Sequence, residues 1–447
     1  MAASAASAAQ LASRLGDVLR RPLLSDAVLA QRVAPLGAVL GHSVEQLMER
    51  LRRARGVENA HDQTHQRTAP VLSHISAAQM KHLLDTTDVR ETAALFAYAD
   101  AVSAAYFDNR IFFRGIVEFS NVCQKNCGYC GIRRATKLHR YTMPKHEILD
   151  CARFCMERGY GTIMLQSGEL NTPQRIDWLV DLIGEIKQTT KQMDTKHPEA
   201  PKGLCVALSV GELDELDYRR LFEAGASRYL LRIETSNPTL YAQLHPPDHL
   251  WQRRVECLRA LKRVGFQLGT GVMIGLPGQT TDDLVSDLHF FRDIDADMIG
   301  MGPYVYQEGT PVGDAHKKLR ERAGQTEQDK MEQNARMVDL TTRMYALARL
   351  FLGAVNIPAT TALQALDPVG RETALQRGAN ILMPIVTPTQ FRKEYQLYED
   401  KPCIDEGAAE CSACLAGRVK WAGKELALGE WGDPPHFHQA SQVCETG

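Results

Sequence analysis

The sequence predicts an α/β protein whose main body is a parallel (βα)8 barrel of the TIM type. Short apolar, β-rich runs recur eight times from residue 111 onwards, and helical apolar spacing follows most of them. Glycine follows several of the expected helices, at the position where helices most often end. Strand–helix units in alternation imply a parallel sheet, which can close into a barrel. An open doubly wound sheet is the alternative.

The expected strands are separated by helical segments and polar turns. They cover residues 111–120, 161–168, 204–211, 227–235, 267–276, 297–305, 354–363 and 380–386. Between them, "KHEILDCARFCMERG" (145–159) and "RRVECLRALKRVG" (253–265) have the apolar spacing of amphipathic helices. Helical spacing also precedes the first strand, with Ser76 as a candidate N-cap. The barrel and this helical lead-in are therefore assigned to residues 75–395.

The composition is that of a globular protein with a large core. The 447 residues are 44% hydrophobic and 24% charged, and the net charge is −2. Without a basic excess or a long apolar run, we expect neither a nucleic-acid partner nor a membrane span. The 11 cysteines are an odd number, and six of them form two triplets. Such clustering favours metal ligation in a reducing compartment over a secreted disulfide scaffold.

The first 74 residues are expected to be a flexible, partly helical segment. The opening "MAASAASAAQLASRLGDVLRRPLL" is rich in Ala and Ser, contains three Arg, and has no acidic residue before Asp17. This composition resembles an organellar transit peptide, which would place the protein in an organelle such as the chloroplast stroma. The alternative is an Ala-rich helix in a cytoplasmic protein.

Three cysteines follow the first expected strand directly. Cys123, Cys127 and Cys130 therefore lie at the carboxyl end of a barrel strand, where barrel active sites are found. Thiolates suit zinc or iron–sulfur centres, and three of them leave one coordination position open. The spacing favours a [4Fe–4S] cluster with one iron free for a non-protein ligand. A zinc site completed by a distant Cys or His, or three free thiols, are the alternatives.

The Cys-x3-Cys-x2-Cys spacing, with Tyr129 before the last cysteine, resembles the signature of radical S-adenosylmethionine (SAM) enzymes. Later segments resemble the HydE-type maturases of [FeFe]-hydrogenase, in several places the algal forms. The resemblance covers roughly residues 110–435 and includes "IMLQSGE", "LSVGEL", "RYLLRIETSNP", "GVMIGLPGQT", "NIPATTALQAL", "GRETALQRGANILMP" and "YQLYEDKPC". Biotin synthase and methylornithine synthase share the first motif and match the later segments less well.

The resemblance implies how the cofactors bind. Cys123, Cys127 and Cys130 would hold a [4Fe–4S] cluster whose open iron chelates SAM, and one electron would cleave SAM into methionine and a 5′-deoxyadenosyl radical. The residues expected to contact SAM are Tyr129, Ser209, Glu234 and Arg254. Glu234 stands out without the family too, because a carboxylate ending an apolar strand is costly unless it has a partner or a task.

A second set of polar residues is expected to bind an anionic substrate. It comprises Arg114, Gln166, Arg232, Thr360, Thr361 and Tyr398. Arg114 lies within the first expected strand, and the two threonines lie within the seventh. Arg232 is two residues before Glu234, on the same face of a strand by its period of two. An Arg232–Glu234 network that only stiffens the barrel is the alternative.

Residues 396–447 form a C-terminal extension with the second triplet, Cys403, Cys411 and Cys414. Some members of the resembled family hold an auxiliary iron–sulfur cluster here, either [2Fe–2S] or [4Fe–4S]. Zinc, with His436 or His438 as the fourth ligand, is the alternative.

The function implied by the resemblance is assembly of the diiron subcluster of the [FeFe]-hydrogenase H-cluster. A sister radical SAM maturase would supply the substrate, a GTPase scaffold maturase would receive the product, and ferredoxin or flavodoxin would donate electrons. A radical SAM mutase or synthase of the methylornithine synthase or biotin synthase type is the alternative enzyme. A non-enzymatic protein for electron transfer or metal sensing is a third hypothesis.

Overall fold

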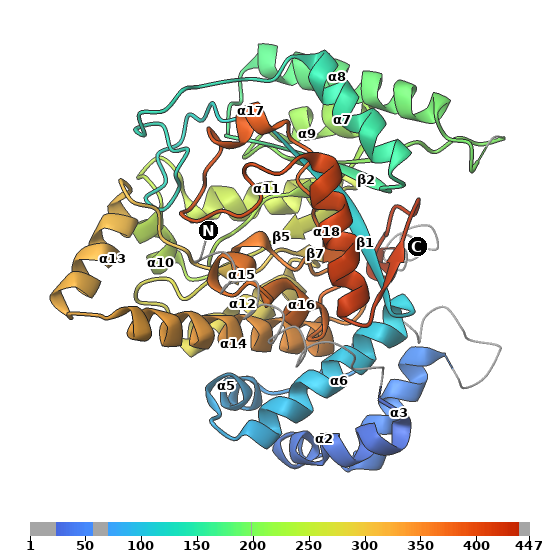
Figure 1. The fold of residues 1–447 in the computed structure, drawn as a ribbon, viewed down its shortest axis with the longest axis vertical. Coiled ribbons are helices and arrows are strands. Elements are labelled where there is room, and N and C mark those ends of the chain that lie inside the picture. Colours follow the sequence, from blue (N-terminus) through green and yellow to red (C-terminus); the bar gives the residue numbers. More distant parts are fainter. Residues whose placement is uncertain (1–23, 57–69, 198, 438–447) are drawn as a thin grey trace, which may run out of the picture.

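Parallel strands form the centre of the fold in the computed structural model, which describes residues 24–56, 70–197 and 199–437 (Figure 1). Neighbouring strands lie side by side in chain order, and every pair is parallel. These strands are β1 (Arg110–Ser120), β2 (Thr162–Ser167), β3 (Cys205–Ser209), β4 (Ala226–Leu230), β5 (Gln267–Thr270) and β7 (Met298–Ile299). The other edge of β1 pairs with β9 (Ile381–Leu382).

A short segment between β7 and β9 closes the ring. Met298 forms a parallel bridge with Asn356, and Pro358 forms one with Ile381. The Ala359 amide donates to the carbonyl oxygen of Ile381 at 2.9 Å. The sheet therefore returns to β1, which confirms the (βα)8 barrel rather than an open sheet. A small parallel pair, β6 (Met273–Ile274) with β8 (Gly302–Pro303), extends one side of the barrel beyond β5 and β7.

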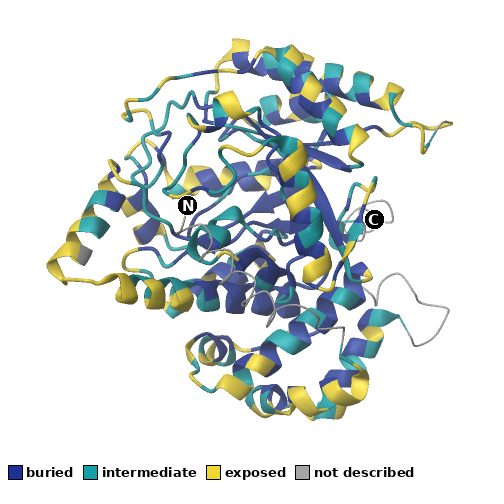
Figure 2. Ribbon diagram, viewed as in Figure 1, coloured by how far each residue is buried: buried dark blue, intermediate teal, exposed yellow. Residues whose placement is uncertain are grey.

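Amphipathic helices surround the strands (Figure 1). In α12, Thr280 and Asp283 form a capping box, and the apolar face of the helix buries Leu284, Leu288 and Phe291. Figure 2 shows that buried residues occupy the strands and the inner helix faces, while exposed residues lie outside. The helices after β1 are α7 (Lys145–Glu157), α8 (Pro173–Gln192), α9 (Glu215–Glu223), α10 (Pro238–Leu244), α11 (Trp251–Val264), α12 (Thr281–Asp293), α13 (Pro311–Arg322), α14 (Glu327–Leu352), α15 (Thr361–Leu366) and α16 (Gly370–Leu375).

The N-terminal part contains four described helices that pack together below the barrel in Figure 1. They are α2 (Asp26–Leu40), α3 (Val44–Arg55), α5 (Ala77–Asp85) and α6 (Val89–Phe107). Leu36 in α2 and Leu47 in α3 are fully buried. The prediction of a flexible segment up to residue 74 is therefore wrong for residues 26–55. Ser76 does cap α5, as predicted, in a capping box with Gln79. The predicted transit peptide lies almost wholly within residues 1–23, outside the described residues.

The C-terminal extension is part of the barrel rather than an appendage. It contains α18 (Ala408–Trp421) and β10 (Glu425–Ala427), and the short helix α17 (Thr389–Arg392) lies just before it. Strand β10 pairs in parallel with the first three residues of β1. Beyond it, the Trp431 carbonyl accepts a hydrogen bond from the buried guanidinium of Arg228 at 2.8 Å, so this segment covers the base of the barrel. Within the described part of the chain, no helix is long and apolar enough to cross a membrane.

Candidate active site

A cavity of about 370 Å³ lies at the carboxyl ends of the barrel strands. It collects side chains that the sequence places far apart. The predicted cluster and SAM residues that line it are Cys123, Cys127, Tyr129, Cys130, Ser209, Glu234 and Arg254. The predicted substrate residues that line it are Gln166, Arg232, Thr360, Thr361 and Tyr398. The structure brings all of these side chains to one cavity, Gln166 and Ser209 from the ends of strands and Arg254 from a helix.

The cysteine loop is held against the barrel by backbone hydrogen bonds. The Gln124 amide donates to the Glu169 carbonyl at 2.8 Å, and the Gly128 amide donates to the Leu244 carbonyl at 2.7 Å. Gly168 allows the close approach, because a Cβ there would lie 2.4 Å from the carbonyl oxygen of Val122. Any larger residue at position 168 would push the loop away from β2.

The cysteine thiols suit a cluster better than a single ion. Three thiolates around one zinc, with Zn–S near 2.3 Å, would lie within about 4.6 Å of one another. Among the described residues, Cys123, Cys127 and Cys130 do not bring their three sulfur atoms within 4.8 Å of one another; the group of three potential ligand atoms that includes one of them is Cys127 with His245 and His249. Burial raises the pKa of all three thiols, that of Cys130 to about 12. A metal centre must therefore displace their protons to bind. Three separated ligands around one cavity fit a [4Fe–4S] cluster.

Glu234 has a strained backbone at the rim of the cavity. Its φ is +64°, in the left-handed region that side chains rarely adopt. The Gly271 carbonyl accepts from its amide at 2.9 Å, and its carbonyl accepts from the Met273 amide at 3.0 Å. Strand β4 ends at Leu230, so the prediction that Arg232 and Glu234 share one strand face is wrong. The turn nevertheless brings them together, with Arg232 Nε 3.1 Å from Glu234 Oε2.

Ser209 and Gln166 lie beside each other on adjacent strands. They are register partners between β3 and β2, and the side-chain amide of Gln166 donates to the hydroxyl of Tyr395 at 3.3 Å. Thr360 and Thr361 also face the cavity, but their predicted place in a strand is wrong. Thr360 is the N-cap of α15 and Thr361 is its first residue, because the last barrel segment before β9 ends sooner than its apolar run.

Arg114 is the one predicted substrate residue that lies elsewhere. Its guanidinium contacts Met298 Sδ at 2.9 Å and the Gly432 carbonyl oxygen at 3.4 Å, at the base of the barrel. The reason is the length of β1, whose 11 residues cross the whole barrel. Two and four residues later, Ile116 and Glu118 on the same face do line the cavity. The prediction that Arg114 binds substrate is wrong.

Glu118 forms a buried ion pair that sequence reasoning missed. Its Oε1 lies 2.5 Å from Nζ of Lys401, which comes from the C-terminal extension, and the two side chains are 3% and 6% exposed. Lys401 also donates to the Tyr395 carbonyl at 2.9 Å. The carboxylate within the apolar run "RGIVEFS" was a usable signal, by the same reasoning that singled out Glu234.

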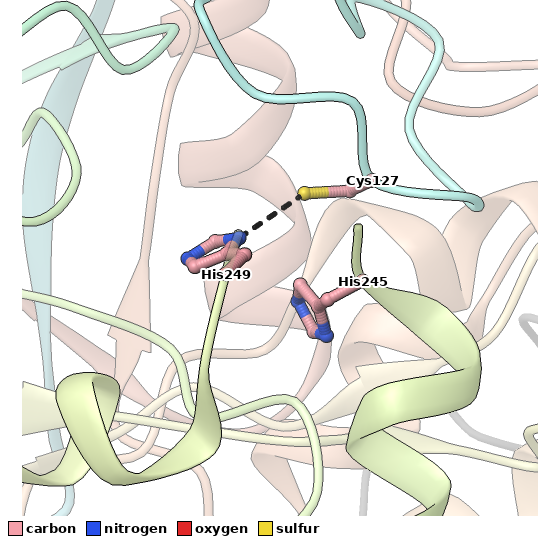
Figure 3. Close-up of side chains that lie close together, drawn as sticks. All are labelled: Cys127, His245 and His249. Carbon is pink, nitrogen blue, oxygen red and sulfur yellow. Dashed lines mark hydrogen bonds between the residues drawn. The ribbon is translucent and has the colours of Figure 1, made fainter. Parts of the chain in front are cut away.

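Arg254 is surrounded by groups that the sequence also failed to indicate. Its Nε donates to Glu212 Oε1 at 2.7 Å, and another guanidinium nitrogen contacts Nε2 of His249. His249 in turn lies beside Cys127, and His245 packs against it (Figure 3). The hydroxyl of Tyr129 is 3.4 Å from Nε2 of His245. Glu212 follows a glycine at a strand end in "LSVGEL", which was a signal; nothing local marked His249.

The second triplet has different surroundings. Cys403 has a φ of +64°, and its thiol forms a hydrogen bond with Cys411 at the start of α18. This shared proton raises the pKa of Cys403 and lowers that of Cys411 to about 6. Cys414, one turn further along α18, is exposed. The structure thus brings two of the three cysteines into direct contact.

Of the two histidines considered for a zinc alternative, the described one has a different partner. Nε2 of His436 lies 2.8 Å from Oδ1 of Asp295, beyond the end of α12. His438 lies outside the described residues. The zinc hypothesis therefore has no fourth protein ligand among these candidates in the described part of the chain.

Comparison with known proteins agrees with this geometry. The sequence profile of the radical SAM superfamily matches residues 117–291. The chain is 40% identical over 354 residues to "[FeFe] hydrogenase maturase subunit HydE" of Thermotoga maritima, covering 79% of this chain and 92% of that protein. This chain belongs to the HydE family. As a member of this family and of the radical SAM superfamily, it is a radical SAM enzyme, and enzymes of this type use a [4Fe–4S] cluster and SAM.

More distant relatives share the fold. The chain is 25% identical to "3-methylornithine synthase" of Methanosarcina acetivorans, covering 70% of this chain and 80% of that protein. A crystal structure of methylornithine synthase (PylB) superposes with a TM-score of 0.65 at 22% identity, covering 79% of this chain and 94% of that one. The HydG maturase of Carboxydothermus hydrogenoformans gives 0.62 at 16% identity, covering 90% and 84%. The similarity to the Thermotoga maritima protein thus establishes HydE-family membership, and the two superposed structures show that the barrel is shared more widely.

Proposed function

We propose that this chain cleaves SAM reductively and uses the 5′-deoxyadenosyl radical to assemble the diiron subcluster of the [FeFe]-hydrogenase H-cluster. The observation that carries the proposal is that one cavity is lined by the first cysteine triplet, the predicted SAM residues and most of the predicted substrate residues. The chain that forms this cavity belongs to the HydE family. When bound, the cluster supplies the electron that breaks a sulfonium C–S bond of SAM. The remaining tasks belong to the protein.

The wall nearest the cysteines fits a zwitterionic nucleoside such as SAM. Tyr129 offers an aromatic face for adenine, and Ser209 offers a hydroxyl. Glu234 offers a carboxylate that suits a ribose hydroxyl or the ammonium group. Arg254 offers a guanidinium near Cys127 that suits the methionyl carboxylate. Holding these groups in one orientation is the main contribution a protein makes when the radical is formed by cofactors.

Further polar residues around the same cavity fit an anionic substrate. Arg232, Thr360, Thr361 and Gln166 provide donors around the same cavity, and Tyr398 closes it from the extension. The burial of Tyr398 raises the pKa of its phenol, so it stays a neutral donor. A sister radical SAM maturase would supply a cysteine-bound iron carbonyl–cyanide unit. A GTPase scaffold maturase would receive the product, and ferredoxin or flavodoxin would reduce the cluster.

We also propose an auxiliary [2Fe–2S] or [4Fe–4S] cluster at Cys403, Cys411 and Cys414. The support is the contact between Cys403 and Cys411 and the position of Cys414 one turn along the same helix. The exposed place of Cys414 would put such a cluster near the surface.

Anaerobically reconstituted protein tests the main proposal. With SAM and a strong reductant, the wild type should release 5′-deoxyadenosine, and Cys127→Ala should release none above background. Cys151→Ala is the matched control, because it removes a buried thiol that belongs to neither triplet. Equal release by wild type and Cys127→Ala would refute the SAM chemistry.

A second test separates the maturase from its relatives. The chain should restore [FeFe]-hydrogenase activity in cells that lack only their own HydE. Failure to do so, combined with turnover of an amino acid or a biotin precursor by the purified protein, would favour the mutase or synthase alternative.

A further inference from the structure

His249 lies against a cysteine of the first triplet, deep in the protein. Its Nδ1 is 3.7 Å from Sγ of Cys127, within hydrogen-bonding reach of sulfur, and the residue is 4% exposed. It lies in the turn before α11, whereas Cys127 lies in the loop after β1 (Figure 3). The contact is therefore made by two segments that are 122 residues apart.

The other ring nitrogen of His249 also has polar neighbours. Nε2 of His249 contacts the guanidinium of Arg254, which is always protonated and can only donate. It also lies 2.9 Å from Oε1 of Glu212, an oxygen that already accepts from Arg254. Nε2 can therefore accept from Arg254 or, if it carries a hydrogen itself, donate to the Glu212 carboxylate. A cluster-bound Cys127 would be a thiolate, which only accepts, so Nδ1 must carry a hydrogen for this contact to be favourable.

The imidazole is also fixed in orientation. It packs edge-on against Tyr241, with ring centroids 6.0 Å apart, and against His245 at 4.9 Å. A buried ring held by an ion pair on one side and by aromatic packing on the other cannot turn away from the sulfur without breaking both contacts. Such support is what keeps a hydrogen-bond donor at a metal ligand.

His245 has a ligand nitrogen within 4.8 Å of Cys127 Sγ but has no donor to offer. Its Nδ1 is 2.9 Å from the Tyr241 carbonyl oxygen, so the ring hydrogen is used there. Burial, together with the charge of Arg254, lowers its pKa to about 2, which keeps the ring neutral. Its free Nε2 is an acceptor beside Tyr129. Only one of the two histidines can thus donate to the cysteine.

We propose that His249 is a positioning residue that donates a hydrogen bond from Nδ1 to the Cys127 thiolate and thereby makes the cluster easier to reduce. The inference rests on the proposed cluster at Cys123, Cys127 and Cys130. A hydrogen bond to a ligand sulfur stabilises the more negative, reduced state of an iron–sulfur cluster. Arg254 and Glu212 act through His249 by holding its ring in place.

Three substitutions at one position test this. His249→Asn places an amide where Nδ1 lies and keeps a donor for sulfur, His249→Gln places it where Nε2 lies, and His249→Ala removes both. In EPR-monitored redox titrations of the reconstituted cluster, His249→Gln and His249→Ala should have the lower reduction potentials. At a fixed solution potential, we expect the ratio of reduced to oxidised cluster to be about tenfold lower than in the wild type, which is equivalent to a shift of about 59 mV for one electron. His249→Asn should stay close to the wild type.

A second readout detects the hydrogen itself. Pulsed EPR in D2O should show an exchangeable deuteron coupled to the reduced cluster in the wild type and in His249→Asn, and its loss in His249→Gln. His245→Phe, which keeps the aromatic packing, is the matched control and should leave the potential unchanged. Unchanged potentials in all three His249 variants, or a wild-type potential only in His249→Gln, would overturn the inference. Absence of the cluster signal from wild type would instead refute the proposed function on which it rests.

Discussion

The two cysteine triplets of this chain have the same ligand type and number but opposite surroundings. The first lines an interior cavity, and its neighbours include a carboxylate from the segment after β3 and an imidazole and a guanidinium from around the start of α11. In the second, Cys411 and Cys414 lie on α18 and Cys403 lies in the loop before it, and Cys414 is exposed. The number of cysteine thiols alone therefore does not show whether a triplet would hold a reactive centre or an accessory one.

The two triplets differ in the side chains that surround their cysteines. Around Cys127, buried charged groups are paired with one another and also face the cavity. Around Cys411, the contact that stands out is with Cys403 itself. An open iron at the first triplet would be enclosed with the bound substrate, whereas at the second it would face solvent. Breaking each triplet in the same way tests this contrast.

The largest expected effect is on SAM cleavage. Cys130→Ala should reduce 5′-deoxyadenosine formation by at least about 100-fold, because losing a ligand costs at least as much as losing its supporting contacts. Cys414→Ala should leave the rate within about threefold, since that thiol lies outside the cavity. Initial rates under anaerobic conditions measure both. A comparable loss in Cys414→Ala would mean that the second centre takes part in the reaction.

The second prediction concerns the connection between the two regions. Lys401→Met leaves the Glu118 carboxylate buried without its cation, so the free energy of unfolding should fall by about 3 kcal/mol. The matched control is Lys393→Met, because Lys393 pairs with Asp405 at the surface, where both side chains are exposed. It should change stability by less than about 0.5 kcal/mol. Urea denaturation followed by circular dichroism measures both values.

The smallest effect is a titration in metal-free protein. The hydrogen bond from Cys403 lowers the pKa of Cys411 to about 6, whereas burial raises that of Cys130 to about 12. Thiolate absorbance at 240 nm should therefore rise by one group as the pH passes 6, and Cys411→Ser should abolish this step. Because the folded pKa lies below the ordinary value of 9.0, this group stabilises the fold increasingly as the pH rises from about 6 towards 9. A first step near 9 would contradict the pairing.

Much of the site was predictable because parallel strands place their carboxyl ends together. That rule, applied to Ser209, Glu234 and Gln166, required only the strand ends and no knowledge of their partners. It failed for Arg114, because apolar spacing does not show how far along a long strand the cavity begins. It misplaced Thr360, because hydroxyl-bearing residues that follow a strand also begin helices.

The groups missed by sequence reasoning depend on contacts between distant segments. Glu118 meets Lys401 across 283 residues, and Glu212 meets His249 across 37. The sequence around Glu118 and Glu212 could mark these carboxylates but could not indicate their partners, since each pair depends on how two segments pack in the finished fold. The fold class was predictable from repetition, whereas the paired charges inside it were not.

The pairing of β10 with β1 has a consequence for the time at which the protein becomes complete. Just before the two strands, the side-chain amide of Asn109 donates to the backbone carbonyl of Gly423, 314 residues later in the chain. At ribosomal speeds of about 5–20 residues per second, β1 would wait roughly 15–60 seconds after its synthesis for this neighbour. Until then the nascent barrel lacks both its floor and the Tyr398 wall. The growing chain therefore carries an open strand edge, a target for chaperones and a point of aggregation, until its last tenth emerges.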